Sequence, residues 1–400
     1  MVDADQAQWQ EFRERARSWL TANVPTTDTD DLAVAKRFQA ALHDAGFAGI
    51  TWPAAYGGQG LGEPAQLAFN DVAKDFDLPT RPFIIGMGMC GPTIVDLGTD
   101  EQKARYLPAL LRGEEIWCQL FSEPGAGSDV ASLQTRAVAD GDGWVLDGQK
   151  VWTTLAHLAD FGAVLARTNP DVPKHQGLTM FIVDMHAPGV EVRPLRDMTG
   201  RAPFNEVFFE NVRLDPDSVI GTVGGGWPAA VTMLGHERVS IGTTVARRSD
   251  PLAFSVLARD ARANGLLDVP AVRAELAQLY ARQRALELFT ARLRQEANAG
   301  SPPGARGSVA KLVGALNAAF AVDVAGTVGG PSVVAAAQDD EQATERALAI
   351  NGIPAAAIAG GTNEIQRNII GERVLGLAKE PSVDRDVPFR ELKVGTQRAE

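Results

Sequence analysis

The chain has 400 residues, of which 45% are hydrophobic and 22% are charged, and this balance is typical of a globular enzyme with two or three domains. Its formal net charge of -12 argues against a surface for nucleic acid or for an anionic membrane. The two cysteines, Cys90 and Cys118, are too few for a disulfide framework and lack the spacing of metal ligands, so we expect no metal site.

The first residues do not have the pattern of a targeting segment. The start MVDADQAQWQEFRERARSWL is charged throughout and contains no apolar stretch of signal-peptide length. No charge-free apolar run in the chain is long enough to span a bilayer. We therefore expect a cytoplasmic protein without a membrane span.

Three types of hydrophobic pattern follow one another along the chain. Amphipathic stretches such as FRERARSWL and PAQLAFNDVAKDF predict an all-α domain over residues 1–115. Short alternating or β-branched runs such as LTMFIVDM and NEVFFENVRL, separated by GDG and APG, predict an antiparallel β domain over residues 116–222. Long helical periods return over residues 223–379, and the polar, Pro-containing residues 380–400 are predicted to form a surface tail.

A literal GxGxxG occurs at Gly86, Gly88 and Gly91. It would indicate a dinucleotide-binding fold if it opened a βαβ unit. Its neighbours are helical, Pro92 follows at once, and no alternating βα pattern surrounds it. A nicotinamide-linked Rossmann enzyme is therefore the least favoured interpretation, and the stretch is better explained as a helix connector or a pocket-lining turn.

Two stretches in the predicted β domain are suited to a flat, anionic ligand. In LFSEPGAGSDVAS the glycines around Ala126 let the backbone approach an anion, and Ser128 adds a hydroxyl, although a tight turn between domains has the same pattern. Some thirty residues later, GQKVWTT places Trp152 beside two threonines at a predicted strand end. A Trp there is more often buried in a core, but a flat ring beside hydroxyls also suits a flavin.

A carboxylate interrupts the apolar run VTMLGHERVSIG of residues 231–242. Ala230, Met233 and Leu234 recur at helical spacing, and the same count places Glu237 on their face. A carboxylate in an apolar setting is a candidate general base. The alternatives are a Glu that pairs with an Arg elsewhere in the fold, or a face that is turned to solvent.

Taken together and in this order, these motifs resemble the acyl-CoA dehydrogenase family over nearly the whole chain. The resemblance is carried by WPAAYGGQGLG, LFSEPGAGSD, GQKVWTT, GHERVSIG and GGTNEIQRNIIGERVLG. It implies an α+β fold in which an N-terminal all-α domain, a middle antiparallel β domain and a C-terminal four-helix bundle surround FAD. It also implies oxidation of the Cα–Cβ bond of an acyl-CoA thioester, and a homodimer or homotetramer.

The resemblance implies a set of cofactor and substrate contacts, residue by residue. Flavin or pyrophosphate contacts are implied for Leu120, Phe121, Ser122 and Ser128, with Trp152 covering the ring and Thr154 bonding its edge. The adenosine half of FAD is implied to lie beside Gly329, Gly330, Thr362 and Glu364. Contacts with the acyl-CoA substrate are implied for Ser128, Arg238, Gly360 and Gly361.

One departure from the family pattern decides the predicted base. Most members carry a Glu directly before a Gly-Thr pair, but in AGGTNE that place is taken by Gly360. A subset that includes isovaleryl- and long-chain acyl-CoA dehydrogenases takes the base from a helix position immediately before an Arg, as Glu237 stands before Arg238. We therefore predict that Glu237 removes the α-proton and that the acyl group is branched, long or bulky.

Two functions stay open besides the Rossmann enzyme. The chain is either an FAD-dependent acyl-CoA dehydrogenase that passes electrons to electron-transfer flavoprotein or a similar acceptor, or a subunit that supports FAD or CoA binding in a mixed oligomer. The retained Glu237 favours the first function. The second is favoured by RRSDPLAFSVLARDARANG, which lacks the Arg-x-x-Phe-Gly stretch that reaches a partner's FAD in many relatives.

Overall fold

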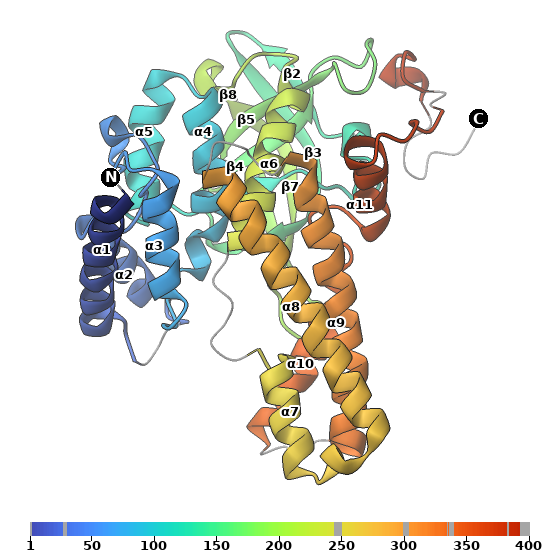
Figure 1. Ribbon diagram of the computed structural model, residues 1–400. Coiled ribbons are helices and arrows are strands. Elements are labelled where there is room, and N and C mark those ends of the chain that lie inside the picture. Colours follow the sequence, from blue (N-terminus) through green and yellow to red (C-terminus); the bar gives the residue numbers. More distant parts are fainter. Residues whose placement is uncertain are drawn as a thin grey trace. The chain divides into compact units, whose positions relative to one another are not determined.

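The computed structural model of the chain describes residues 2–26, 30–243, 250–298, 304–333, 335, 340–381 and 384–392. The chain divides into two compact units, Met1–Ser240 with Pro381–Glu400 and Ile241–Glu380, and each is described by itself. The first unit holds the N-terminal helices and a β-sheet, and the second is helical (Figure 1). The predicted α+β class, with helical, β and helical parts in this order, is confirmed.

The N-terminal part of the first unit is helical, and polar caps explain where two of its helices begin. The Asp31 side chain accepts from the amide of Val34 at 2.9 Å, and Thr99 forms a reciprocal capping box with Gln102. These helices are α1 (Val2–Asn23), α2 (Leu32–Asp44), α3 (Glu63–Ala73), α4 (Gly91–Leu97) and α5 (Asp100–Leu111).

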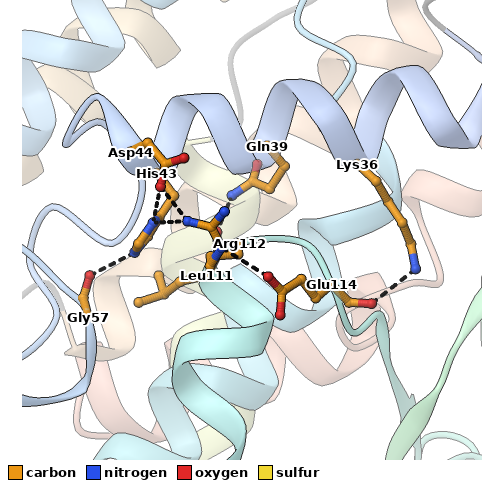
Figure 2. A network of polar contacts seen from close by, with 8 residues as sticks. All are labelled: Lys36, Gln39, His43, Asp44, Gly57, Leu111, Arg112 and Glu114. Atoms are coloured by element: carbon orange, nitrogen blue, oxygen red, sulfur yellow. Dashed lines mark hydrogen bonds and ion pairs between the residues drawn. The ribbon is translucent and has the colours of Figure 1, made fainter.

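A polar network joins the end of α2 to the end of α5 (Figure 2). Arg112, just past α5, forms an ion pair with Asp44 and donates to Glu114 at 2.9 Å. The buried Gln39 of α2 donates to the carbonyl of Leu111 at 2.9 Å. Because the last carbonyls of a helix have no partner within it, this bond satisfies the end of α5 and holds α2 against it.

The GMGMC stretch forms a π-helix, Gly86–Cys90, that continues directly into α4. A 3-10 turn, Arg81–Phe83, precedes it, where a Rossmann fold would have a strand. A Cβ added to Gly91 would lie 2.0 Å from the indole of Trp52, so this glycine permits close packing of the helix. The glycines therefore shape a helix bulge, a feature that is frequent at functional sites.

The sheet of the first unit has the order β6-β7-β3-β2-β4-β5-β8, with β1 also paired to β4. Along each strand the side chains alternate between its two faces, as in β7, whose burial alternates residue by residue over its first half. The strands are β1 (Trp117–Leu120), β2 (Arg136–Asp140), β3 (Gly143–Thr154), β4 (Phe161–Arg167), β5 (Leu178–Asp184), β6 (Val190–Leu195), β7 (Phe204–Leu214) and β8 (Val219–Ile220).

The prediction of an antiparallel sheet is wrong at two pairings. β1 runs parallel to β4, and β2 meets β4 in parallel where Arg136 faces Arg167. Parallel neighbours need a long connection, and a long loop with the β2–β3 hairpin lies between β1 and β4. As a result, the loop that follows Leu120 leaves β1 in the direction in which β4 also runs.

One apolar core joins the N-terminal helices, one face of the sheet and helix α6 (Gly226–Thr243). The core also contains side chains of the loop between β1 and β2, so this loop and α6 are anchored in the same packing. Its members include Ile94, Leu107 and Leu110 of the helices, Ala163 and Met180 of the sheet, Phe121, Ala126 and Leu133 of the loop, and Ala230 and Met233 of α6.

The second unit is built from α7 (Phe254–Ala263), α8 (Pro270–Asn298), α9 (Gly307–Gly329), α10 (Glu341–Ala356) and α11 (Asn363–Ile369). By length and composition, one described segment, Gly304–Gly329, is apolar enough to cross a membrane. Its side chains Val324 and Val328 pack in a core that Leu257 of α7 and Leu279 of α8 share, and α8 and α9 lie side by side (Figure 1). This packing covers part of the apolar surface of α9 within the second unit.

Candidate functional site

The structure brings the two motif stretches of the β domain side by side. The carbonyl of Ser122, in the loop after β1, accepts from the amide of Val151 in β3 at 2.9 Å. Lys150, the neighbour of Val151, donates from Nζ to the carbonyl of Phe121 at 3.1 Å. Because Trp152 follows Val151 directly in β3, these bonds hold the loop after β1 next to the residue that carries the indole.

A buried ion pair also holds the loop after β1 against β3. Lys150 Nζ lies 2.8 Å from Oε1 of Glu123, and the two side chains are 0% and 8% exposed. Burial lowers the pKa of Lys150, and the charge of Glu123 opposes this shift. Burial alone would raise the pKa of Glu123, but the charge and hydrogen bond of Lys150, together with the bonds from Thr135 and Gln134, outweigh burial and leave this pKa lowered. The charged form of each group is therefore favoured by the other.

Glu123 also closes the base of the loop that ends at β2. Its carboxylate accepts from the amides of Gln134 at 2.7 Å and Thr135 at 2.9 Å, and its backbone forms a two-way bridge with Ala126. The loop tip is left exposed at Ser128, and a Cβ added at Gly127 would meet nothing within 4 Å. The tip thus offers backbone and a hydroxyl to a ligand, as an anion-binding turn requires.

Trp152 is 57% exposed although it lies within the long strand β3. Its φ of 60° is left-handed, and the register of β3 against β7 shifts between Lys150 and Thr153. Such a bulge re-aims a side chain at the cost of about 1–3 kcal/mol of backbone strain. The indole touches Phe204 edge-on at 5.7 Å and presents the rest of its surface outward. The more common alternative, a core Trp, is wrong here.

The remaining predicted flavin contacts in the first unit differ in exposure. The side chains of Leu120 and Phe121 lie in apolar cores, so any cofactor contact there passes through their backbone. Ser122 is half-buried, and Thr154 is half-buried at the end of β3 opposite Phe204. The loop tip, Trp152, Ser122 and Thr154 thus have side chains that are at least partly accessible to a flat ligand.

Glu237 lies on α6, two to three turns beyond the start of the helix, and its side chain is half-buried. Its helix is anchored on one side by Ala230 and Met233, which are buried in the core shared with the loop. The adjacent His236 contacts Asp96 of α4 through Nε2 at 2.8 Å, which ties α6 to the N-terminal helices. The side chain of Arg238 lies outside the described residues.

The other predicted contacts lie in the second unit. Gly360 and Gly361 form a turn with φ of 66° and 90°, and their carbonyls accept from the buried Gln366 at 2.8 and 3.2 Å. Thr362 caps α11 by accepting from the amide of Ile365 at 3.3 Å. This turn is held by these local bonds and by Nζ of Lys311 in α9, which donates to the carbonyl of Gly361 at 2.6 Å. Its two glycines suit it because left-handed backbone strains other residues.

The three remaining residues of that group lie at helix ends. Gly329 is the last residue of α9, and Gly330 follows it with φ of 55°. Glu364 is exposed in the first turn of α11, where hydrogen bonds from its own backbone amide and from Thr362 lower its pKa. The structure therefore gathers the predicted residues into two groups, one in each unit, and each group is built by contacts within its own unit.

Lys150 and Glu123 are structural determinants of this site that the sequence did not single out. Both lie inside the quoted motifs, as the Glu of SEPGAGSD and the Lys of GQKVWTT. Charged residues are mostly found on surfaces, so single residues in a sequence give no signal that two of them pair in a core. The fold brings them together across 27 residues of sequence.

Family models match the chain in three consecutive parts. The acyl-CoA dehydrogenase N-terminal domain matches residues 6–114, the middle domain matches residues 118–212, and the C-terminal domain matches residues 224–375. Together they span the helical, β and helical parts of the fold in chain order.

Two relatives from Mycobacterium tuberculosis show how far the similarity extends. The acyl-CoA dehydrogenase FadE34 is 41% identical over 342 residues, which are 85% of this chain but 46% of FadE34, so the chain spans less than half of that relative. The acyl-CoA dehydrogenase IpdE1 is 37% identical over 387 residues, which are 93% of this chain and 98% of IpdE1.

Solved structures with the same fold include complexes. The Tcur3481-Tcur3483 steroid ACAD superposes with a TM-score of 0.79 and 28% identity, over 94% of this chain and 98% of that one. The ChsE4-ChsE5 complex from Mycobacterium tuberculosis superposes with a TM-score of 0.77 and 30% identity, over 93% of this chain and 98% of that one.

We expect Lys150→Met to destabilise the first unit, because it leaves the carboxylate of Glu123 buried without its counter-charge. Removal of one partner of a buried pair costs about 3–5 kcal/mol. The double variant Lys150→Met/Glu123→Gln should recover part of this loss. Chemical denaturation of both variants measures the effect, with Lys74→Met, at an exposed lysine, as the control; equal midpoints for Lys150→Met and the wild type would contradict the expectation.

Proposed function

This chain belongs to the acyl-CoA dehydrogenase family, and on that basis we propose that it oxidises an acyl-CoA thioester to the 2-enoyl-CoA with Glu237 as the base. It is an FAD-dependent oxidoreductase. The observation that carries the proposed mechanism is the placement of Glu237 on α6, whose residues Ala230 and Met233 lie in the core that also holds the loop of residues 121–133. The position that carries the base in most relatives is Gly360 in this chain.

The geometry of the first unit fits a flavin. The exposed Trp152 ring offers a flat surface, Thr154 offers a hydroxyl at the end of the same strand, and the open turn at Gly127 and Ser128 offers amides to the pyrophosphate. A bound FAD would supply the acceptor for a hydride from the β-carbon of the substrate. A base must then take the α-proton from the opposite face of the substrate, and we assign this role to Glu237.

Glu237 suits proton abstraction because of where its helix is anchored. The buried Ala230 and Met233, two turns and one turn earlier, fix α6 against the loop, and the bond between His236 and Asp96 fixes it against α4. A base held between two packed elements loses little orientational freedom during proton transfer, which is what a near-attack geometry requires. In the proposed reaction, Glu237 takes the α-proton while backbone donors stabilise the developing enolate oxygen.

The proposed substrate class is a bulky acyl group on CoA. The π-helix Gly86–Cys90 contains two glycines and the partly buried Met87, a combination that leaves space and adapts to irregular shapes. A protein described as a steroid ACAD shares the fold at 28% identity, and this similarity supports a bulky acyl group here.

Electron-transfer flavoprotein or a similar acceptor is the proposed electron partner, and the cytoplasm is the proposed location. A dimer or tetramer is supported by α9, because only 33% of its apolar window is buried within the chain. An apolar helix face of this kind is stabilised when a second copy covers it.

A second candidate function is a subunit that supports FAD or CoA in a mixed oligomer. It is favoured by the Gly at position 360, by the missing Arg-x-x-Phe-Gly stretch, and by the similar ChsE4-ChsE5 structure, which is a complex of two named components. The absorbance spectrum and molar mass of the purified chain distinguish the two functions. We expect a yellow homo-oligomer; a colourless chain that gains flavin only with a second gene product would favour the supporting subunit.

Thr154→Val should perturb bound flavin while leaving the fold intact. The change removes one hydroxyl and nearly preserves shape, so a lost bond of about 0.5–1.5 kcal/mol should slow flavin reduction about two- to tenfold. Stopped-flow absorbance measures this rate. Thr153→Val is the control, since the buried Thr153 hydroxyl has no hydrogen-bond partner among the described residues. Equal reduction rates for both variants and the wild type would remove Thr154 from the flavin site.

Glu237→Gln should slow flavin reduction by substrate by a factor of about 10² to 10⁴, the usual contribution of a positioned base. Gln preserves shape but cannot accept the α-proton, so acyl-CoA should still bind and perturb the flavin spectrum. Glu210→Gln, at an exposed glutamate of β7, is the matched control and should reduce at the wild-type rate. Full activity of Glu237→Gln would leave the chain without an identified base.

A further inference from the structure

The C-terminal segment of residues 384–392 returns to the first unit and packs on the connection between β4 and β5. The amide of Phe389 donates to the carbonyl of Val172 at 2.9 Å, and the amide of Arg390 donates to the carbonyl of Pro170 at 3.0 Å. The described residues 384–392 of the predicted tail are thus attached, by backbone bonds, to the connection between β4 and β5, more than 200 residues away in sequence.

The first link between this segment and the flavin loop is Lys174, at the tip of the connection. Its Nζ lies 2.8 Å from Oδ2 of Asp129 in the loop and 2.6 Å from Oδ2 of Asp384 in the tail, and its side chain is 12% exposed. Burial alone would lower the pKa of Lys174, but these two carboxylates outweigh burial and raise it. One ammonium therefore joins the tail to the residue that follows Ser128.

The second link is Arg167, the last residue of β4, which is 4% exposed. Its guanidinium donates to the loop carbonyls of Ala131 at 2.6 Å and Leu133 at 3.3 Å. The ring of Phe389 covers the guanidinium at 3.6 Å from the ring centroid. Shielding of this kind strengthens the bonds of a cation to its acceptors because it excludes competing water.

We propose that Asp384 and Phe389 are positioning residues that hold the loop of residues 123–133 in its flavin-binding shape. The proposal rests on the proposed function, since the contact between this loop and FAD is part of it. Asp384 acts through Lys174 on the outer half of the loop, and Phe389 acts through Arg167 on its return to β2. Loss of either link frees loop carbonyls and Asp129 to reorient, so FAD must pay to order the loop when it binds.

The two links are tested with Asp384→Asn and Phe389→Leu in the full-length holoenzyme, with Asp386→Asn as the control. Asp386 is an exposed tail carboxylate with the same charge and no ion pair among the described residues. Deuterium exchange of the amides of residues 126–133 reports the loop, and fluorescence of released flavin gives the FAD dissociation constant. We expect faster loop exchange and an FAD dissociation constant raised about two- to tenfold for both variants, the size expected when one part-buried interaction is lost.

Several outcomes separate positioning from a general loss of stability. Asp384→Glu should restore slow exchange and FAD affinity, because it retains the charge. Unchanged loop exchange and unchanged FAD affinity in both variants would overturn the proposal, as would equal effects in Asp386→Asn. If the wild type binds no FAD while the loop exchanges faster in the variants, the positioning role stands and the proposed function fails. If Asp384→Asn does not fold, Phe389→Leu tests the second link alone.

Discussion

The buried ion pair between Lys150 and Glu123 is the constraint on which the candidate site depends. A buried charge without a partner costs several kcal/mol, so this pair persists because each group finds further bonds, Lys150 at a loop carbonyl and Glu123 at two amides. These bonds use the polar groups at the base of the loop and leave its tip at Ser128 exposed. Because Lys150 lies two residues before Trp152, the same pair fixes the position of the loop relative to the strand that carries the exposed indole.

Further contacts connect the loop to the helix of the proposed base and to the tail. The connection between β4 and β5 touches the loop through Lys174, the tail through Asp384, and the first turn of α6 through the ring of His175, which lies 4.7 Å from that of Trp227. The helix that carries Glu237 is therefore tied to the loop of residues 121–133 by packing and by this connection. A reaction that removes a proton and a hydride from opposite faces of one bond needs such mutual positioning.

The second unit presents a different kind of construction. Its glycine turn at Gly360 and Gly361 is held by bonds from Gln366 and Lys311, and its left-handed backbone would strain a glutamate, which explains in physical terms why this turn suits glycine. Of the two positions at which the resemblance implies a base, this chain has a glycine at Gly360 and a carboxylate at Glu237. Gly360 is also compatible with a supporting subunit, so the flavin content of the isolated chain distinguishes the two candidate functions.

Local pattern was enough to determine much of this protein from its sequence. Helical and alternating periods located the helical and β parts, helical neighbours argued against a Rossmann turn at Gly86, and ordered motifs indicated the family and FAD. The parallel pairing of β1 with β4, the left-handed Trp152 and the pair of Lys150 with Glu123 could not be predicted in this way. Each depends on contacts between residues that are far apart in sequence. A buried charge is stable only beside its counter-charge, and a shift in strand register turns a ring outward, so only the tertiary structure decides these features.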